Sequence, residues 1–332
     1  MNYQLSWYLR RHADERHTVE DLAAAVGTAE EQVLADLAEL TREGFRFDRH
    51  PTLGLHLAAV PATMDRDEIV AARAGKRIGR TVHVYDSTRS TNDVAARLAA
   101  AGPGSDGLVV TAEEQSGGRG RQGAVWFGSR GESLLVSVVH WAESRADTAA
   151  EITLAAGVAM AEALAEAARV RAGIKWPNDV EISRRKVAGI LVERPGGNEV
   201  GSRGDGLGRK AAYIIGIGVN VNQTAERFPE EIAGRATSVR EATGQIMDRT
   251  LLLERLLDRL EILLDTQGRG WLEDLLGRYM AFSDMIGRHV VVRESGKTFA
   301  GSVASVSPHY ALVVHLDEGE YRSFEASKVH LL

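Results

Sequence analysis

Two arginines stand between glycines in the segment Gly117–Gly123, which reads Gly-Gly-Arg-Gly-Arg-Gln-Gly. Glycines let a backbone approach a ligand closely, and the guanidinium groups of Arg119 and Arg121 can each bind a carboxylate or a phosphate through two hydrogen bonds. A positively charged loop of this kind suits the conversion of a carboxylic acid into an acyl phosphate. The alternative is a flexible surface turn that binds no ligand.

The glycines of this segment also match the spacing Gly-x-Gly-x-x-Gly over Gly118–Gly123. A dinucleotide-binding fingerprint requires a helix directly after that spacing, whereas Trp126-Phe127-Gly128-Ser129 and a further predicted strand follow here. No Gly-Lys-Ser/Thr closes the segment, as a phosphate-binding P-loop needs, and no His-Arg-Asp or Asp-Phe-Gly follows it, as in a protein kinase. The chemistry of this segment is therefore assigned to its arginines.

A second group of polar residues lies in the run Lys175-Trp176-Pro177-Asn178-Asp179. Pro177 favours an extended or turned backbone at Trp176 and cannot continue a helix. We therefore expect Asn178 and Asp179 at a turn between two strands, where a carboxylate can contact a metal ion or an amine.

Lys186 stands at the start of an apolar run, Val187–Glu193, that we predict to be a buried strand. Because a lysine at the mouth of such a strand can point into a cavity, Lys186 is a candidate for neutralising a phosphate. Gly189 would let a flat ligand lie against the strand. The alternative for Lys186 is a solvated surface side chain.

Polar side chains also stand at the ends of two predicted elements. Ser90-Thr91-Asn92 opens a helix, where hydroxyls act as caps, although the same groups can bind the polar atoms of a ring. One predicted strand ends at Asn220, and a second amide, Asn222, follows two residues later. These two amides suit the edge of an adenine or a ribose, or form a turn.

These residues need a scaffold of strands and helices to bring them together, and residues 63–284 supply an alternation of both. The predicted strands are Thr81–Tyr85, Leu108–Ala112, Leu134–His140, Gly173–Lys175, Val187–Glu193 and Tyr213–Asn220, and the predicted helices are Asn92–Ala101, Thr148–Ala168 and Arg249–Asp265. The glycine-rich stretch from Pro195 to Lys210 has no apolar pattern, so we predict a mobile loop there.

Residues 1–62 show three short helical patterns followed by a hairpin, the order of a winged helix-turn-helix. Thr18 and Thr28 are expected to cap the second and third helices, and Gly27 to end the second. The segments Phe45–Phe47 and Leu53–Leu57 alternate like two strands. The alternative is a small helical docking module.

The charge of this segment argues against tight DNA binding. Residues 1–60 contain six arginines, no lysine and ten acidic residues, a net charge of −4. Phosphate contacts dominate DNA affinity, and only Arg46 and Arg49 in the hairpin, beside His50, are placed to make them. We expect weak operator binding at best.

The last segment, residues 285–332, contains five short β patterns in under 50 residues, which predict a small barrel. They are His289–Arg293, Phe299–Val306, Ala311–Leu316, Tyr321–Phe324 and Val329–Leu332.

The composition of the 332-residue chain is that of a globular protein, with 44% hydrophobic and 26% charged residues and a net charge of −6. It contains no cysteine, which excludes disulfide scaffolds, thiolate nucleophiles and iron–sulfur clusters and suits a reducing compartment. No apolar run approaches the ~18–20 residues of a membrane span, and the N-terminus is no secretory signal. We expect a cytoplasmic protein with no membrane partner.

In their order along the chain, these motifs resemble those of the biotin protein ligases. The resemblance rests on Ser90-Thr91-Asn92, the loop Gly118–Gly123, the run Lys175–Asp179, the run Lys186–Glu193 and the strand end Gly216–Asn220. It implies an α+β fold: an N-terminal winged helix (1–62), a central mixed-sheet catalytic domain (63–284) and a C-terminal SH3-like barrel (285–332).

The resemblance also implies a reaction in two steps, in which ATP, with Mg²⁺, activates biotin as biotinoyl-5'-AMP, and a lysine of a biotin carboxyl carrier protein then takes the biotin. Both steps build negative charge on phosphate oxygens, so preorganised cations carry much of the catalysis. The implied catalytic residues are Arg119, Arg121, Lys186 and Asp179. The implied biotin contacts are Ser90, Thr91, Asn92, Gln115, Gly118, Arg119, Gly120, Arg121, Lys186 and Gly189. The implied ATP contacts are Arg121, Trp126, Asn178, Asp179, Lys186 and Asn220, with Asp179 also facing Mg²⁺.

Two alternatives stay open beside a bifunctional, dimeric ligase. One is a lipoate ligase, although the chain lacks the Arg-Arg-x-x-Gly-Gly-Gly-x-x-x-His signature of that group. The other is a biotin-sensing repressor with vestigial ligase activity. One departure from the family is Ala124-Val125, where family members often carry further basic residues, so we expect fewer positive charges around the adenylate.

Overall fold

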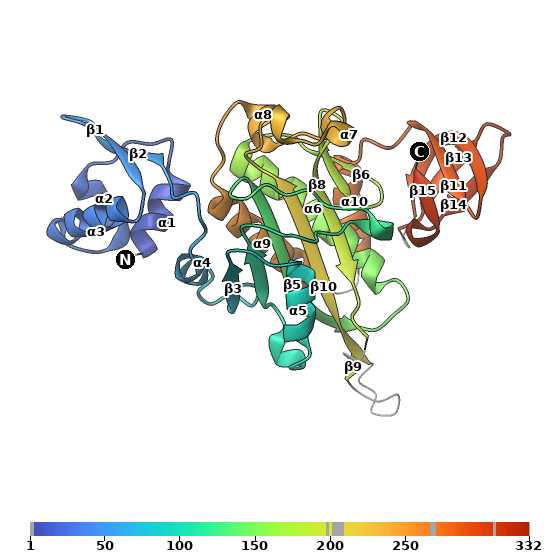
Figure 1. Ribbon diagram of the computed structural model, residues 1–332, viewed down its shortest axis with the longest axis horizontal. Helices are drawn as coiled ribbons and strands as arrows, with labels where there is room; N and C mark the ends of the chain where they lie inside the picture. The colour runs from blue at the N-terminus through green and yellow to red at the C-terminus, as the bar shows by residue number, and fades with distance from the viewer. Residues whose placement is uncertain (1–2, 197–198, 201–208, 266–269, 308–309, 332) are drawn as a thin grey trace.

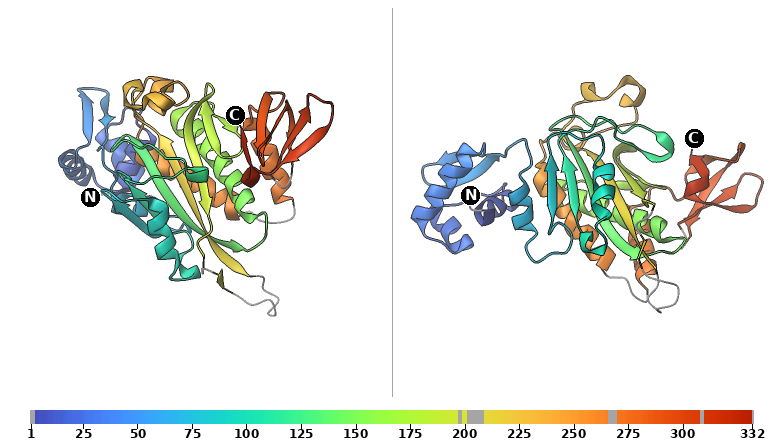
Figure 2. Two further views of the ribbon diagram at one scale, coloured as in Figure 1. Left: turned by 45° about the vertical axis from the view of Figure 1, so that its right-hand side comes forward. Right: turned by 60° about the horizontal axis from the view of Figure 1, so that its bottom comes forward.

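The computed structural model describes residues 3–196, 199–200, 209–265, 270–307 and 310–331. Figure 1 shows a central sheet with helices on both faces, flanked at one end by a small N-terminal unit and at the other by a C-terminal β sheet. The two views in Figure 2 keep these small units at opposite ends of the molecule. The predicted α+β fold is confirmed.

The N-terminal unit has three helices and a hairpin, as predicted: α1 (Tyr3–Arg11), α2 (Val19–Val26), α3 (Glu30–Arg42), β1 (Arg46–His50) and β2 (Gly54–Ala59). Thr18 caps α2 in a full capping box with Asp21, and Gly27 ends it in the left-handed conformation. The prediction that Thr28 caps α3 is wrong, because Ala29 is the N-cap and makes no side-chain bond.

The N-terminal unit is attached to the central one through a buried arginine of α1. Arg10 donates to both carboxylate oxygens of Glu68, at 2.9 and 2.8 Å, and also contacts Asp248. Because Arg10 and Glu68 are both nearly inaccessible to solvent, removing Arg10 would leave the buried carboxylate of Glu68 without its ion-pair partner. This ion pair joins the N-terminal unit to the central one, together with the contacts of Trp7 with Glu68 and of Arg11 with Glu254.

The central sheet is mixed, as predicted. Its strands are β3 (Val82–Tyr85), β4 (Val109–Ala112), β5 (Ser133–Glu143), β6 (Gly173–Lys175), β7 (Asp179–Ile182), β8 (Arg185–Glu193), β9 (Glu199–Val200) and β10 (Lys210–Asn220). They run in the order β3-β4-β5-β10-β8-β7-β6, with β9 on β10. β3 and β4 are parallel, and the other recorded pairs are antiparallel. β9 falls within the predicted glycine-rich loop, most of which lies outside the described residues.

Helices cover both faces of the central sheet. The long helices α6 (Thr148–Ala168) and α9 (Arg249–Asp265) pack on one face, and α5 (Thr91–Ala99) packs on the other. Successive residues of β5 therefore enter different cores: Val138 joins the α6 side and Val139 the α5 side. α6 is apolar and long enough to span a membrane, but 72% of its apolar window is buried in the protein, as in a core helix.

Further helices connect and edge the central layers. They are α4 (Arg66–Ala72), α7 (Glu230–Ala233), α8 (Val239–Thr243), α10 (Trp271–Phe282) and the short 3-10 turns η1 (Pro103–Ser105), η2 (Arg121–Gly123), η3 (Ala225–Arg227) and η4 (Ala326–Lys328). Neither α4 nor α10 is among the helices predicted from the sequence.

The C-terminal unit is a five-stranded antiparallel sheet, in agreement with the five predicted β segments. Its strands are β11 (His289–Glu294), β12 (Lys297–Val306), β13 (Leu312–Leu316), β14 (Tyr321–Phe324) and β15 (Val329–Leu331). One face of this sheet, with Val292, Val303 and Phe324, joins the same hydrophobic cluster as α6 and α10. The C-terminal unit is therefore packed against the central one.

Candidate active site

A cavity of about 370 Å³ opens on the α5 face of the central sheet, beyond the first turn of α5. α5 is nine residues long, so it covers only part of that face. The strands beside its N-terminus carry small residues there, among them Gly189, Gly216 and Gly218. The lining residues are Ser90, Thr91, Asn92, Gln115, Arg119, Gly120, Arg121, Ala124, Val125, Trp126, Val136, Asn178, Asp179, Lys186, Gly189, Ile190, Leu191, Gly216, Ile217 and Gly218.

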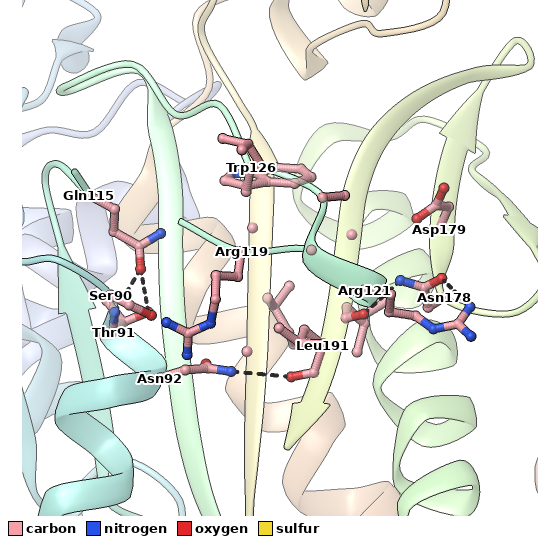
Figure 3. A pocket seen from close by; sticks show the side chains of 18 of the residues that line it. Ser90, Thr91, Asn92, Gln115, Arg119, Arg121, Trp126, Asn178, Asp179 and Leu191 are labelled. Atoms are coloured by element: carbon pink, nitrogen blue, oxygen red, sulfur yellow. Dashed lines mark hydrogen bonds between the residues drawn. The ribbon is translucent and has the colours of Figure 1, made fainter. Parts of the chain in front are cut away.

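One end of the cavity carries a group of uncharged polar side chains. The backbone N–H and the hydroxyl of Thr91 donate to Oε1 of Gln115, at 2.7 and 3.0 Å. The Ser137 hydroxyl lies 2.7 Å from the Thr91 hydroxyl and 2.6 Å from Oδ1 of Asn92, and its one proton is donated to either of these acceptors. Ser90 is the N-cap of α5 but makes no side-chain capping bond. Capping therefore does not account for the Ser90 hydroxyl, which lines the cavity (Figure 3).

Arg119 is held by two carboxylates. Its guanidinium donates to Asp93 at 2.6 and 3.1 Å and to Glu193 at 3.3 and 3.5 Å, and Glu193 also accepts from Nδ2 of Asn92 at 2.6 Å. The hydrogen bond to Asp93, with the charge of Glu193, raises the pKa of Arg119, and the same bond lowers the pKa of Asp93. A ligand anion must therefore compete with protein carboxylates for Arg119.

Arg121 points to the other end of the cavity and to the C-terminal unit. It donates to Oδ1 of Asn178 at 3.4 Å and to the carbonyl oxygen of Ala326, and burial lowers its pKa. The next residue, Gln122, donates to the carbonyl oxygen of Val329 at 3.5 Å. The glycine–arginine loop is thus attached to the C-terminal unit rather than free in solvent.

Lys186 and Asp179 form an ion pair of 2.7 Å beside this arginine. Asp179 is the first residue of β7, and Lys186 is the second residue of β8, so the strand begins slightly earlier than predicted. Asn178 lies in the turn before β7, as expected, and its Nδ2 donates to the carbonyl oxygen of Ile190 at 2.8 Å. This hairpin brings a cation, a carboxylate and an amide to one end of the cavity.

Trp126 lies flat on two glycines of the sheet. A Cβ atom at Gly218 would be 2.4 Å from its Cε2 atom, and one at Gly189 would be 3.0 Å from its Cζ3 atom. The sequence predicts a flat ligand against the strand at Gly189, and in this structure the indole ring of Trp126 lies there. Trp126 also lines a second hollow of about 320 Å³ on its other side, together with Gly118.

Four predicted site residues lie outside the cavity lining. Asn220 lies on β10 beyond Gly218, where its Nδ2 donates to the carbonyl oxygen of Thr237 at 3.0 Å and its Oδ1 accepts from Gln223. Arg46 and Arg49 are exposed on β1, in the N-terminal unit. Gly118 lines the second hollow instead. The structure gathers the other predicted residues around one cavity.

The sequence interpretation missed Glu193, Ser137 and the roles of Gly216 and Gly218. The signal for Glu193 is its position, since this carboxylate ends the apolar run that begins at Lys186. Gly216 faces Asn92, since a Cβ there would be 2.3 Å from its Oδ1 atom. Ser137 carries no local signal, because it lies in the middle of an apolar strand.

Comparison with known proteins agrees with this geometry. Residues 84–204 match the biotin/lipoate A/B protein ligase family. A biotin–[acetyl-CoA-carboxylase] ligase of Mycobacterium tuberculosis is 34% identical over 236 residues, which cover 70% of this chain and 80% of that protein. The chain belongs to the biotin protein ligase family.

Other relatives extend this similarity along the chain. A bifunctional ligase/repressor BirA of Bacillus subtilis is 28% identical over 308 residues, covering 92% of this chain and 91% of its own. A solved biotin protein ligase mutant of Aquifex aeolicus, in complex with biotin, is 25% identical with a TM-score of 0.62, over 76% of this chain and 98% of that one. Within this biotin protein ligase, the matched residues 84–204 contain all the cavity-lining residues except Gly216, Ile217 and Gly218.

Proposed function

We propose that this chain activates biotin with ATP, as biotinoyl-5'-AMP, and transfers it to a lysine of a biotin carboxyl carrier protein. The observation that carries the proposal is one cavity with two different ends (Figure 3). The α5 end offers the uncharged donors and acceptors of Ser90, Thr91, Asn92 and Gln115, which suit the neutral ring of biotin. The other end holds Arg121 and Lys186 beside Asn178 and Asp179, which suits phosphates.

In the first step, a carboxylate oxygen of biotin attacks the α-phosphorus of ATP, the new O–P bond forms, and pyrophosphate leaves. Charge builds on the α-phosphate oxygens during this step. Lys186 and Arg121, already positioned at that end, stabilise it electrostatically without reorganisation. Arg119 joins them when a ligand anion replaces its carboxylate partners.

In the second step, the amine of the carrier lysine attacks the carbonyl carbon of the adenylate, and AMP leaves with the oxygen of the broken bond. The amine must lose a proton, and the usual pKa of a lysine is about 10.4. We assign Asp179 as the acceptor, because it is the carboxylate lining the charged end of the cavity.

The donor set fits Mg²⁺ that arrives with ATP. Among the described residues, no group of three or more His, Cys, Asp or Glu side chains is placed to hold a metal ion, which argues against a resident centre. Mg²⁺ keeps several waters and phosphate oxygens and needs one or two carboxylates from a protein. Asp179, with Asn178, would hold it, and the ion would neutralise phosphate charge.

The relatives support the choice of substrate and acceptor. The Mycobacterium tuberculosis protein is named a biotin–[acetyl-CoA-carboxylase] ligase, so the acceptor proposed here is the carrier subunit of such a carboxylase.

We further propose a cytoplasmic homodimer with domains at 1–62, 63–284 and 285–332.

The test of the proposed function is transfer to a purified carrier domain in the presence of Mg²⁺ and ATP. Labelled biotin should appear on the carrier lysine, and substitution of that lysine by arginine should abolish the label. Lipoate in place of biotin is the control for substrate class. Transfer of lipoate but not biotin would assign the chain to the lipoate ligases. Transfer of neither would contradict the ligase function and favour a biotin-sensing repressor with vestigial ligase activity.

We also propose weak operator DNA binding by the N-terminal unit. Three helices and a hairpin precede the central unit, the hairpin projects away from it (Figure 1), and Arg46 and Arg49 are exposed on β1. A relative that covers 92% of this chain is named a bifunctional ligase/repressor. The exposed acidic residues of α3 limit the affinity.

A further inference from the structure

We propose that Tyr310, in the C-terminal unit, is a positioning residue for the phosphate end of the cavity. The inference rests on the proposed ligase function, and it assigns to the C-terminal unit a part in the first step. Tyr310 lies between β12 and β13 and is 3% exposed.

The backbone of Tyr310 adopts an unfavourable conformation. Its φ angle is +57°, in the left-handed region that a tyrosine rarely adopts and a glycine adopts freely. Such a conformation persists only where the surroundings determine it. The contacts of the Tyr310 side chain hold the backbone in this conformation.

Tyr310 makes two hydrogen bonds to the turn that carries Asn178 and Asp179. Its hydroxyl donates to the carbonyl oxygen of Pro177 at 2.5 Å, and its carbonyl oxygen accepts from Nε1 of Trp176 at 2.9 Å. The Tyr310 ring also packs edge-on against the Trp176 ring, with centroids 6.4 Å apart. Trp176 and Pro177, the two residues directly before Asn178 and Asp179, are thus both hydrogen-bonded to Tyr310.

The turn is held from the opposite side by β8. The N–H of Ile190 donates to the carbonyl oxygen of Asn178 at 2.9 Å, and Nδ2 of Asn178 donates back to the carbonyl oxygen of Ile190 at 2.8 Å. Tyr310 and β8 therefore bind the turn from opposite sides. Loss of one side leaves the Asp179 carboxylate, and with it the Lys186 ammonium, less well fixed.

The C-terminal unit contacts the glycine–arginine loop as well. Arg121 donates to the carbonyl oxygen of Ala326, and Gln122 donates to that of Val329. Both segments that supply charge to the phosphate end are therefore bound to the same unit. The α5 end, with Thr91 and Gln115, lies on the other side of the cavity (Figure 3).

The test compares Tyr310→Phe with Tyr213→Phe in the full-length chain. Both changes remove one buried hydroxyl, since Tyr213 is 1% exposed and belongs to the same hydrophobic cluster, but Tyr213 lines no part of the cavity. Pyrophosphate release is measured against ATP and, separately, against biotin. Tyr310→Phe should lower kcat/KM for ATP about tenfold, the effect of one hydrogen bond, and leave the KM for biotin within about twofold.

Hydrogen exchange of the backbone amides gives a second readout that does not depend on activity. Tyr310→Phe should raise exchange in peptides spanning 173–193 and leave peptides spanning 88–116 unchanged. Kinetic constants and exchange equal to those of Tyr213→Phe would overturn the positioning role. An equal loss for ATP and biotin, with exchange raised along the whole chain, would show a merely structural role. An unmodified chain that releases no pyrophosphate would contradict the ligase function itself, while the exchange result would still decide whether Tyr310 holds the turn.

Discussion

The ammonium group of Lys186 lies 2.7 Å from a carboxylate oxygen of Asp179 and 5.5 Å from the centroid of the Trp126 ring. The lysine is therefore oriented before any ligand binds, by a carboxylate from the neighbouring strand and by an aromatic face. A cation already in place stabilises developing phosphate charge without the cost of reorganisation.

Replacing Lys186 by alanine should slow adenylate formation by roughly 10²–10³-fold, which corresponds to about 2.7–4 kcal/mol for one lost electrostatic partner. The measurement is pyrophosphate release with saturating biotin and ATP. Lys210→Ala is the matched control, because Lys210 is exposed at the far end of β10. Near-normal release by the Lys186 variant would remove this residue from the catalytic set.

Arg121→Gly should let the adenylate escape. Arg121 links the glycine–arginine loop to Asn178 and to the backbone carbonyl of Ala326 in the C-terminal unit. A loop that closes over an intermediate also retains it. Escaped biotinoyl-5'-AMP acylates lysines of unrelated proteins, so labelling of a bystander such as albumin should rise well above that of the unmodified chain. Labelling at the unmodified level, in a variant that still forms adenylate, would refute retention by Arg121.

Glu193→Ala should weaken biotin binding. Glu193 accepts from Asn92 and Arg119, and hydrogen bonds that involve a charged group contribute about 1.5–3 kcal/mol each. We expect the KM for biotin to rise at least about tenfold, with a smaller change in the KM for ATP. Glu143→Ala, an exposed carboxylate at the end of β5, serves as control. A variant whose two KM values change together would contradict the expectation that Glu193 acts through Asn92, at the α5 end of the cavity.

Gly218→Ala should displace Trp126, because the added methyl carbon would lie 2.4 Å from the indole. Activity should fall at least about tenfold, and the fluorescence of the tryptophans should change. Gly277→Ala is the control: nothing lies within 4 Å of the added carbon in helix α10, and the change should stabilise that helix by about 0.5–1 kcal/mol. Full activity in Gly218→Ala would show that Trp126 moves aside freely.

DNA binding by the N-terminal unit should be weak and should fall steeply with salt. Exchanging Arg46 and Arg49 together for alanine removes two phosphate contacts and should lower the log–log salt slope by roughly 2. The measurement is an anisotropy titration with the DNA upstream of the chain's own gene, with biotin and ATP, at near-physiological salt. Sequence-specific binding at nanomolar protein that is indifferent to both exchanges would contradict the charge argument.

Local signals singled out many of the residues that line the cavity, because these residues follow one another at fixed spacing. Thr91 and Asn92 open a helix, Asn178 and Asp179 follow a proline, and Lys186 opens a strand, so each could be recognised from its neighbours. The main strands of the central sheet and the C-terminal β segments were predicted within a few residues for the same reason.

Contacts between distant segments could not be predicted in this way. Ser137 meets Asn92 because the central strands and α5 pack together, and the turn at Trp176 meets Tyr310 across 134 residues. Asn220, which the resemblance places near the nucleotide, lies outside the cavity lining, and its amide donates to the carbonyl oxygen of Thr237. α4 was missed because it is only seven residues long, with Ile69 as its one buried apolar side chain.

The most direct test of the central claim is mass spectrometry of the nucleotide products formed when the purified chain meets biotin, ATP and Mg²⁺ without any carrier protein. We predict biotinoyl-5'-AMP bound to the unmodified chain, and little or none with Lys186→Ala. Absence of the adenylate from the unmodified chain, or equal yields from the two proteins, would contradict the account.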